Sequence, residues 1–186
     1  LAVSPAYGTD HQVWTGSVDE GIAISTDGGA TWTLRNNGIT DLAIHDIALS
    51  PDYMHDRTAF VLAWKGLFKS TDGGQSWRQV SVSVMQELHR VVLSPAYASD
   101  HTLFVGTRGC QVEGVVWKSS DGGLTWSAVG GNPGWCHARA LAIAPNFQSS
   151  HELLVGDDWG GVYRSTNGGT SWLRVHESRF SWAAAY

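Results

Sequence analysis

The octapeptide Ser25-Thr-Asp-Gly-Gly-Ala-Thr-Trp32 occurs in four versions along the chain, and the other three end at Trp77, Trp126 and Trp172. The first residues of the four copies are 45, 49 and 46 residues apart. A period of this length, with one recurring turn and short apolar runs around it, is typical of stacked four-stranded sheets. The chain is therefore a repeat protein, and its other motifs are interpreted by their place in the repeat.

Each repeat contains four short runs that fit β-strands. In the second repeat we expect strands over 47–49, 59–63, 66–70 and 76–80. In the third repeat we expect them over 91–93, 103–107, 115–119 and 125–129. The pattern predicts one all-β domain over residues 1–186, a β-propeller with four-stranded antiparallel blades. The predicted repeats are about 1–46, 47–90, 91–139 and 140–177, which form either a four-bladed ring or part of a larger propeller or assembly.

The octapeptide itself suits a structural turn. Its acidic side chain can accept N–H groups of its own turn, and its glycines permit a positive φ. In the fourth copy Asn167 replaces the aspartate, which keeps an acceptor oxygen and loses the charge. A turn tolerates that change better than a catalytic carboxylate does. We therefore expect a structural role for Ser25, Asp27, Gly29, Trp32, Ser70, Asp72, Gly74, Trp77, Ser119, Asp121, Gly123, Trp126, Ser165, Asn167, Gly169 and Trp172.

The four octapeptides resemble the Asp-box, or bacterial neuraminidase repeat, and the resemblance covers nearly the whole chain. Proteins with this repeat are β-propellers, among them sialidases, xyloglucan hydrolases, sortilin-type receptors and photosystem II assembly factors. The resemblance implies that each box joins the third and fourth strands at the blade periphery, away from the central channel. It implies a fold and leaves the function open.

Irregular segments are where a repetitive scaffold usually carries recognition. They are the loops between the second and third strands and the blade-to-blade connections, which we expect on the face opposite the boxes. Trp64, Trp135 and Trp159 there can stack on a sugar or a partner, or simply pack over the loops. His45, His89 and Arg139 share one position before the repeated proline and can form a basic rim. The candidate binding residues on this face are Trp64, Trp135, Trp159, Asp157, Asp158, Arg108, Arg139, His45 and His89.

The same face carries the chain's two cysteines, Cys110 and Cys136. An insertion contributes one and the following connection the other, so we expect a disulfide, with free thiols as the alternative. A disulfide favours an extracellular or cell-surface location. The net charge of −5 and the scattered arginines argue against nucleic acid as a partner. No apolar run is long enough to span a membrane.

Five carboxylates belong to this face, which is too many to single out the pair that a glycosidase needs: Asp19, Glu20, Glu113, Asp157 and Asp158. No arginine triad with a tyrosine, as in a sialidase, is evident. The recurring His11, His101 and His151 lack the spacing of metal ligands, so we expect no metal and no cofactor.

The leading functional hypothesis is a non-catalytic extracellular scaffold or protein- or glycan-binding module. We expect it to self-associate through residues 178–186, which resemble the first strand of a further blade. A fragment of a sialidase- or xyloglucanase-like glycoside hydrolase is the alternative. An assembly factor for a membrane complex is a third hypothesis.

Overall fold

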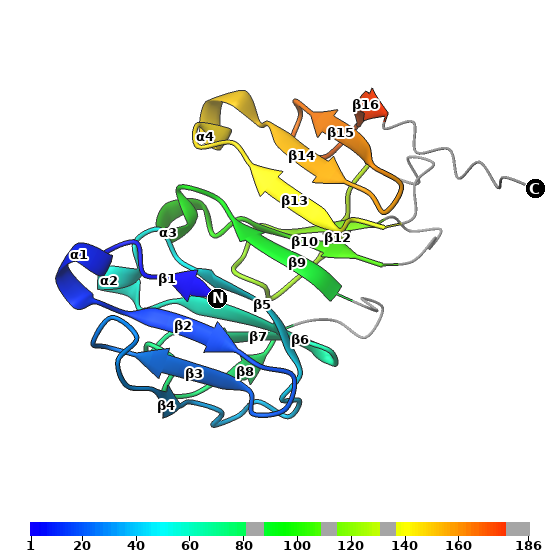
Figure 1. Ribbon diagram of the computed structural model, residues 1–186. Coiled ribbons are helices and arrows are strands. Elements are labelled where there is room, and N and C mark those ends of the chain that lie inside the picture. Colours follow the sequence, from blue (N-terminus) through cyan, green and yellow to red (C-terminus); the bar gives the residue numbers. More distant parts are fainter. Residues whose placement is uncertain (81–87, 109–114, 131–136, 178–186) are drawn as a thin grey trace, which may run out of the picture.

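The computed structural model describes residues 1–80, 88–108, 115–130 and 137–177, which form four antiparallel sheets of four strands each (Figure 1). Blade 1 consists of β1 (Ala2–Val3), β2 (Val13–Gly16), β3 (Ile22–Ser25) and β4 (Thr33–Leu34). Blade 2 consists of β5 (Ile44–Leu49), β6 (Ala59–Ala63), β7 (Gly66–Ser70) and β8 (Arg78–Gln79). Blade 3 consists of β9 (Leu88–Leu93), β10 (Leu103–Thr107), β11 (Val116–Ser119) and β12 (Ser127–Ala128). Blade 4 consists of β13 (Ala140–Ile143), β14 (Leu153–Gly156), β15 (Gly161–Ser165) and β16 (Leu173–Glu177).

Within every blade the strands pair in chain order, so each sheet is a simple meander. The first strands β5, β9 and β13 contact one another across the blades and form the inner side of the arc, whereas the fourth strands lie outside. This arrangement confirms the all-β propeller fold. Figure 1 shows blades 1 and 4 at opposite ends of an open arc, so the four described blades do not close into a ring.

Three apolar cores lie between consecutive blades and account for the packing. The first combines Trp14 and Ile22 of blade 1 with Tyr53 and Trp77 of blade 2. The second and third repeat this arrangement between blades 2 and 3 and between blades 3 and 4. Because side chains alternate across a strand, each blade has two apolar faces and contributes one to each neighbouring core.

The loop between the first and second strands forms one helical turn in every blade: α1 (Tyr7–Asp10), α2 (Tyr53–Asp56), α3 (Tyr97–Asp100) and α4 (Phe147–Ser150). Each turn ends at a residue in the left-handed region, with φ near 50°: His11, Arg57, His101 and His151. The carbonyl oxygens of these four residues accept hydrogen bonds from the Asp-box N–H groups of Gly28, Gly73, Gly122 and Gly168. The recurring residues His11, His101 and His151 therefore connect the helical turn to the Asp-box through their backbone carbonyl groups.

The observed inner strands begin earlier than the sequence predicts. Strand β5 begins at Ile44 and β9 at Leu88, because polar residues continue the ladder beyond the apolar run. The outer strands β8 and β12 are shorter than expected, with two residues each. In the part of the chain that is described, no helix is long and apolar enough to cross a membrane.

Candidate functional site

The Asp-box acts within its own hairpin. In blade 1 Ser25 Oγ donates to Asp27 Oδ1 at 2.7 Å, and the N–H and hydroxyl of Thr31 donate to the two oxygens of the same carboxylate. The N–H of Gly29 completes the turn by donating to Ser25 Oγ. Blades 2 and 3 repeat these bonds around Asp72 and Asp121.

These hydrogen bonds favour the ionised carboxylate. The side chain and N–H of Thr31 lower the pKa of Asp27 to about 2. Burial alone would raise the pKa of Asp72, but bonds from Ser76 and Ser70 lower it to about 2. In blade 4 Asn167 Oδ1 accepts from Ser165 Oγ and from the N–H of Ser171, while its Nδ2 donates to Ser171 Oγ. The amide therefore reproduces the turn without a charge.

The indoles of the boxes link neighbouring blades. Trp77 Nε1 donates to the carbonyl oxygen of Arg35 at 2.8 Å, and Trp126 Nε1 donates to that of Val80 at 2.9 Å. Trp32 differs, because no blade precedes it among the described residues, and it is exposed. Of the four box tryptophans, Trp77 is buried, Trp126 and Trp172 are partly buried and Trp32 is exposed.

The opposite face carries a cluster centred on Asp158, which we call the Asp158 cluster: His45, Trp64, His89, Arg108, His137, Arg139, Asp158 and Trp159. Asp158 accepts hydrogen bonds from His137 Nδ1 and Arg139 Nε. The imidazole of His137 stacks on the indole of Trp159, with ring centroids 5.9 Å apart. Arg108 and His137 pair as a β-bridge, which brings blades 3 and 4 together at this point.

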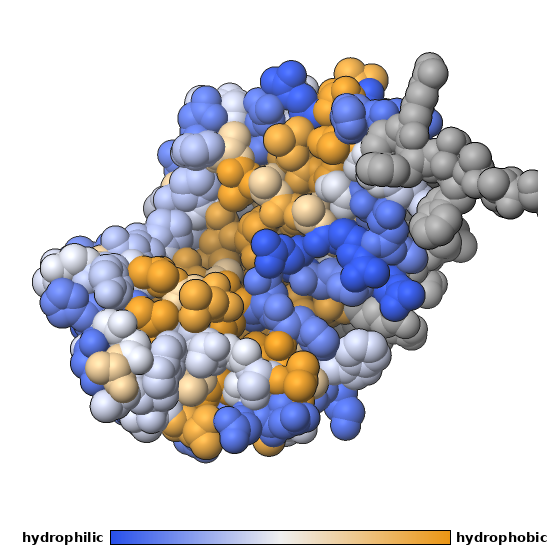
Figure 2. Space-filling view, in the orientation of Figure 1, coloured by the Kyte–Doolittle hydropathy of each residue, from blue (hydrophilic) through white to orange (hydrophobic). Residues whose placement is uncertain are grey.

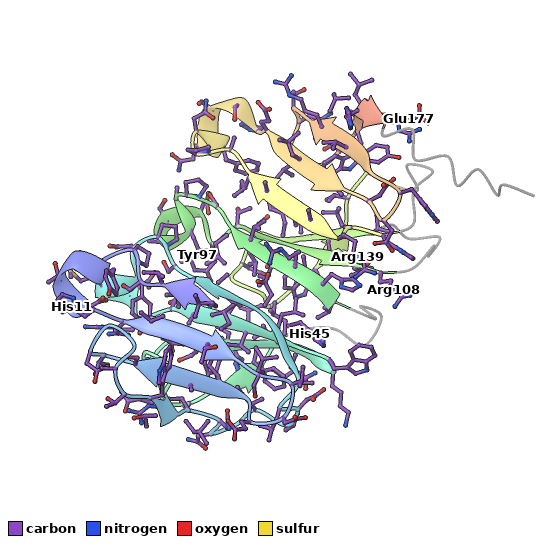
Figure 3. All side chains as sticks on the ribbon, viewed as in Figure 1. His11, His45, Tyr97, Arg108, Arg139 and Glu177 are labelled. Carbon is purple, nitrogen blue, oxygen red and sulfur yellow. The ribbon has the colours of Figure 1, made fainter. Side chains whose placement is uncertain are left out.

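Blades 2 and 3 contribute the remaining members. The ring of His45 lies 5.5 Å from that of Trp64. His89 faces the charges of Arg139, Arg108 and Asp158, and its buried Nε2 has no hydrogen-bond partner among the described residues. Figure 3 shows His45, Arg108 and Arg139 on one face of the arc, on the side away from His11 and Tyr97. In Figure 2 a hydrophilic patch lies on this side of the molecule, beside apolar surface along the inner strands.

The electrostatics set distinct protonation states. Burial, with Arg139 and Arg108 nearby, lowers the pKa of His89, so its imidazole stays neutral near pH 7. Burial would raise the pKa of Asp158, but the bonds from His137 and Arg139 lower it. Asp158 is therefore an ionised carboxylate that faces the imidazole of His137 and the guanidinium of Arg139.

A second carboxyl group on the inner strands behaves differently. Asp46 accepts hydrogen bonds from Arg90 Nη1 at 3.0 Å and from the N–H of Val91 at 2.9 Å. Its burial outweighs these bonds and raises its pKa. Because both oxygens have partners, Asp46 ties β5 of blade 2 to β9 of blade 3.

The structure separates the carboxylates that the sequence grouped together. Asp157 is part of a turn, where its Oδ1 accepts the N–H groups of Trp159 and Gly161 and its Oδ2 accepts the hydroxyl of Tyr163. Asp19 and Glu20 are exposed in the β2–β3 loop of blade 1. Glu113, Trp135, Cys110 and Cys136 lie outside the described residues, and so do the expected disulfide and the expected strand 178–186.

Sequence reasoning missed His137, although it stands two residues before Arg139 and therefore on the same side of an extended segment. No group of three or more histidine, cysteine, aspartate or glutamate side chains that could hold a metal occurs among the residues described.

A groove of about 720 Å³ lies on the box face between blades 3 and 4, lined by Lys118, Phe147 and Asn167 among others. Its walls are the repeated turns that hold every blade together. The Asp158 cluster is the better candidate because its residues depart from the repeat.

The family model "Sortilin, neurotensin receptor 3" of Sortilin-Vps10 matches residues 20–154, and the chain belongs to this family. A curated xyloglucanase of Hypocrea jecorina (strain QM6a) is 26% identical over 143 residues, which cover 75% of this chain and 16% of the xyloglucanase. The structure of an ancestral GH74 enzyme aligns with a TM-score of 0.68 and 24% identity over 88% of this chain and 22% of that enzyme. YCF48 bound to D1 peptide aligns with a TM-score of 0.62 and 19% identity over 89% of this chain and 51% of YCF48.

These similarities confirm the propeller family and correct one expectation. The prediction that the chain is not an enzyme is contradicted, because its curated relative is a xyloglucanase and a structural neighbour is a GH74 enzyme. The error has a physical reason. A glycosidase carboxyl pair is defined by its separation in space, which the spacing of carboxylates along the chain does not reveal.

Proposed function

We propose that this chain forms part of a secreted, xyloglucanase-like glycoside hydrolase and that the Asp158 cluster contributes to its sugar-binding face. The observation that carries the proposal is the ionised carboxylate of Asp158, held by His137 and Arg139 beside the exposed indole of Trp159. The identity to the curated xyloglucanase supports the substrate class, and a polysaccharide substrate, which is too large to cross a membrane, favours secretion.

The exposed indoles suit a polysaccharide. Trp64 and Trp159 occupy equivalent positions in the β6–β7 and β14–β15 loops, and both are exposed. A pyranose ring presents C–H groups that pack on an indole face, while its hydroxyls bond to neighbouring polar groups. Their imidazole neighbours, His45 and His137, hold the two indoles on the same face.

The protonation state of Asp158 limits its chemical role. Glycoside hydrolysis needs one protonated carboxyl group as general acid and one carboxylate as general base or nucleophile. Asp158, with its lowered pKa, fits the carboxylate role. The chain spans 16% of the curated xyloglucanase, and we propose that the general acid lies in another part of the protein.

The test measures reducing ends released from xyloglucan, a mixed β-glucan and a sialoside by the complete protein that carries this chain. We expect turnover of xyloglucan, and we expect Asp158→Asn to lower kcat by about 100-fold or more, the range for a general base. The matched control is Asp19→Asn, which removes an equally small carboxylate from the corresponding loop of blade 1 and should leave kcat unchanged. Trp159→Ala should raise KM about 3- to 10-fold through lost stacking.

Two results would contradict the proposal. One is the absence of turnover on all three substrates by a folded protein. The other is full activity of Asp158→Asn on xyloglucan, which would remove Asp158 from the reaction and leave the Asp158 cluster without a catalytic role.

A further inference from the structure

We propose that Asn37 is a site of spontaneous deamidation and that its isoaspartate product weakens the junction between blades 1 and 2. The proposal is independent of the hydrolase function. Asparagine followed by glycine occurs twice in the chain, at Asn37-Gly38 and at Asn167-Gly168. The reacting groups of the two pairs are chemically identical, so a large difference in their reactivity has to come from the fold.

Deamidation joins the asparagine side chain to the next peptide nitrogen. That nitrogen loses its proton to solvent base and bonds to Cγ, the Cγ–Nδ2 bond breaks, and ammonia leaves behind a five-membered succinimide ring. Water then opens the ring without any oxidation or reduction. Cleavage between Cγ and nitrogen gives aspartate, and cleavage between the backbone carbonyl carbon and nitrogen gives isoaspartate. The reaction is favoured by a free N–H, a free carboxamide and a following glycine, which has no side chain to obstruct the attack.

Asn37 meets these requirements. It is exposed in the connection between β4 and β5. Its Nδ2 makes one long contact, 3.4 Å from the carbonyl oxygen of Gln75, and its Oδ1 has no hydrogen-bond partner among the described residues. The N–H of Gly38 likewise has no acceptor in the described part of the chain. The two groups that react are therefore not held apart by other bonds.

In the pair Asn167-Gly168 the box occupies the same groups. Asn167 Oδ1 accepts hydrogen bonds from Ser165 Oγ and from the N–H of Ser171, and its Nδ2 donates to Ser171 Oγ. The N–H of Gly168 donates to the carbonyl oxygen of His151 at 2.9 Å. The attack has to break these bonds first, so it requires a local opening of the turn.

The other asparagines lack one requirement each. Both the oxygen and the nitrogen of the Asn36 carboxamide are hydrogen-bonded, at 2.8 and 2.7 Å. Asn146 is followed by Phe147, whose N–H already donates to a carbonyl oxygen. Asn132 is followed by Pro133, which has no N–H. Asn37 is therefore the asparagine that we expect to react first.

The fold requires the glycine that makes Asn37 reactive. Gly38 has a φ of +92°, and a Cβ there would lie 2.1 Å from the carbonyl oxygen of Trp77. Asn37 belongs to the same contact, because its carbonyl oxygen accepts the N–H of Trp77 at 2.8 Å. Isoaspartate inserts a methylene into the backbone at this point and displaces the carbonyl group that Trp77 binds. We therefore expect it to weaken the packing of blade 2 on blade 1.

Peptide mapping of the complete protein that carries this chain, aged in mildly alkaline buffer, tests the site. Trypsin places the two pairs in separate peptides, 36–57 and 165–174, and mass spectrometry measures the deamidated fraction of each. We expect Asn37 to react about tenfold or more faster than Asn167 in the folded protein, because the bonds around Asn167 have to open first. In urea, where the fold is lost, the two rates should converge.

Three results would overturn the assignment. One is an equal rate for the two pairs in the folded protein, and another is a difference that persists in urea. The third is fragment ions that place the modification on Asn36 instead of Asn37, since both lie in the same peptide.

Thermal unfolding tests the effect on the junction. The Tm of aged wild type should fall as its isoaspartate content rises. Asn37→Gln should keep its Tm on ageing, because the longer side chain would have to close a six-membered ring. Freshly prepared Asn37→Asp should match fresh wild type, since it adds the charge without the extra methylene. An equal fall for aged Asn37→Gln, or no fall for wild type rich in isoaspartate, would contradict the proposed weakening.

Discussion

The packing of the box tryptophan between blades predicts a large difference between two chemically identical substitutions. Trp77 is almost fully buried, its ring lies 6.1 Å from that of Trp14, and its indole binds the carbonyl of Arg35. Trp32 is exposed, and among the described residues its indole donates to the carbonyl oxygen of Gly29 in its own hairpin. Trp77→Ala and Trp32→Ala therefore remove the same atoms from two different environments.

The structure gives the expected magnitudes. An indole buries about 150–250 Å², worth about 4–6 kcal/mol at about 25 cal/mol per Å². Alanine retains part of this, so we expect Trp77→Ala to cost about 3–5 kcal/mol. Trp32→Ala should cost about 1 kcal/mol, near the range of surface substitutions. For a chain of 186 residues, 4 kcal/mol corresponds to a fall in Tm of about 8–16 °C.

Equilibrium urea unfolding, followed by tryptophan fluorescence, measures both variants. Equal losses of unfolding free energy for the two variants would refute the inference that the box tryptophan stabilises the preceding blade.

The other predictions concern the turns. The lowered pKa of Asp72 means that the folded state binds fewer protons than the unfolded state below about pH 4. This contribution to stability is therefore present above pH 3.8, the ordinary pKa of an aspartate, and is lost as the pH falls towards 2. Asp72→Asn should keep the turn, as Asn167 does, and should make the unfolding free energy fall less steeply as the pH is lowered. Asp72→Ala should destabilise the protein at pH 7 as well. Identical dependence of unfolding free energy on pH for wild type and Asp72→Asn would contradict this. Gly38→Ala should lower the free energy of urea unfolding by more than about 1 kcal/mol. The reason is that φ of Gly38 is +92° and a new Cβ would lie 2.1 Å from the carbonyl oxygen of Trp77. Gly8→Ala is the control, because a Cβ at Gly8 would meet open space. Asn167→Asp should leave the Tm nearly unchanged at pH 7, since Ser165 and Ser171 already donate to this position, and a loss of several degrees would show that the amide is required.

The sequence predicted the blades well because their signals are local. Strands β6 and β7 match the predicted ranges residue for residue, since apolar runs bounded by a turn need no knowledge of the rest of the fold. The starts of β5 and β9 were missed because His45, Asp46 and His89 are polar residues in paired strands. Their pairing depends on the inner side of the arc, which no local pattern shows.

The candidate site was predicted only in part. Trp64, Trp159, Arg139 and His89 do lie on one face with Asp158, because departures from the repeat mark its irregular loops. The sequence grouped Asp157 with Asp158, yet Asp157 holds a turn and Asp158 binds His137 and Arg139. Adjacent residues of one type thus acquire different roles from hydrogen bonds that form only after the blades stack.

The bonds between the helical turns and the box glycines also bear on how such proteins diversify. On that side, backbone hydrogen bonds join the helical turn of each blade to its box. Their acceptors are the carbonyl oxygens of His11, Arg57, His101 and His151. Insertions there would break a junction, whereas the opposite side can gain or lose residues at little cost. The 49-residue spacing between the second and third boxes already shows such an expansion, so new specificities in this lineage should arise by lengthening loops on one side alone.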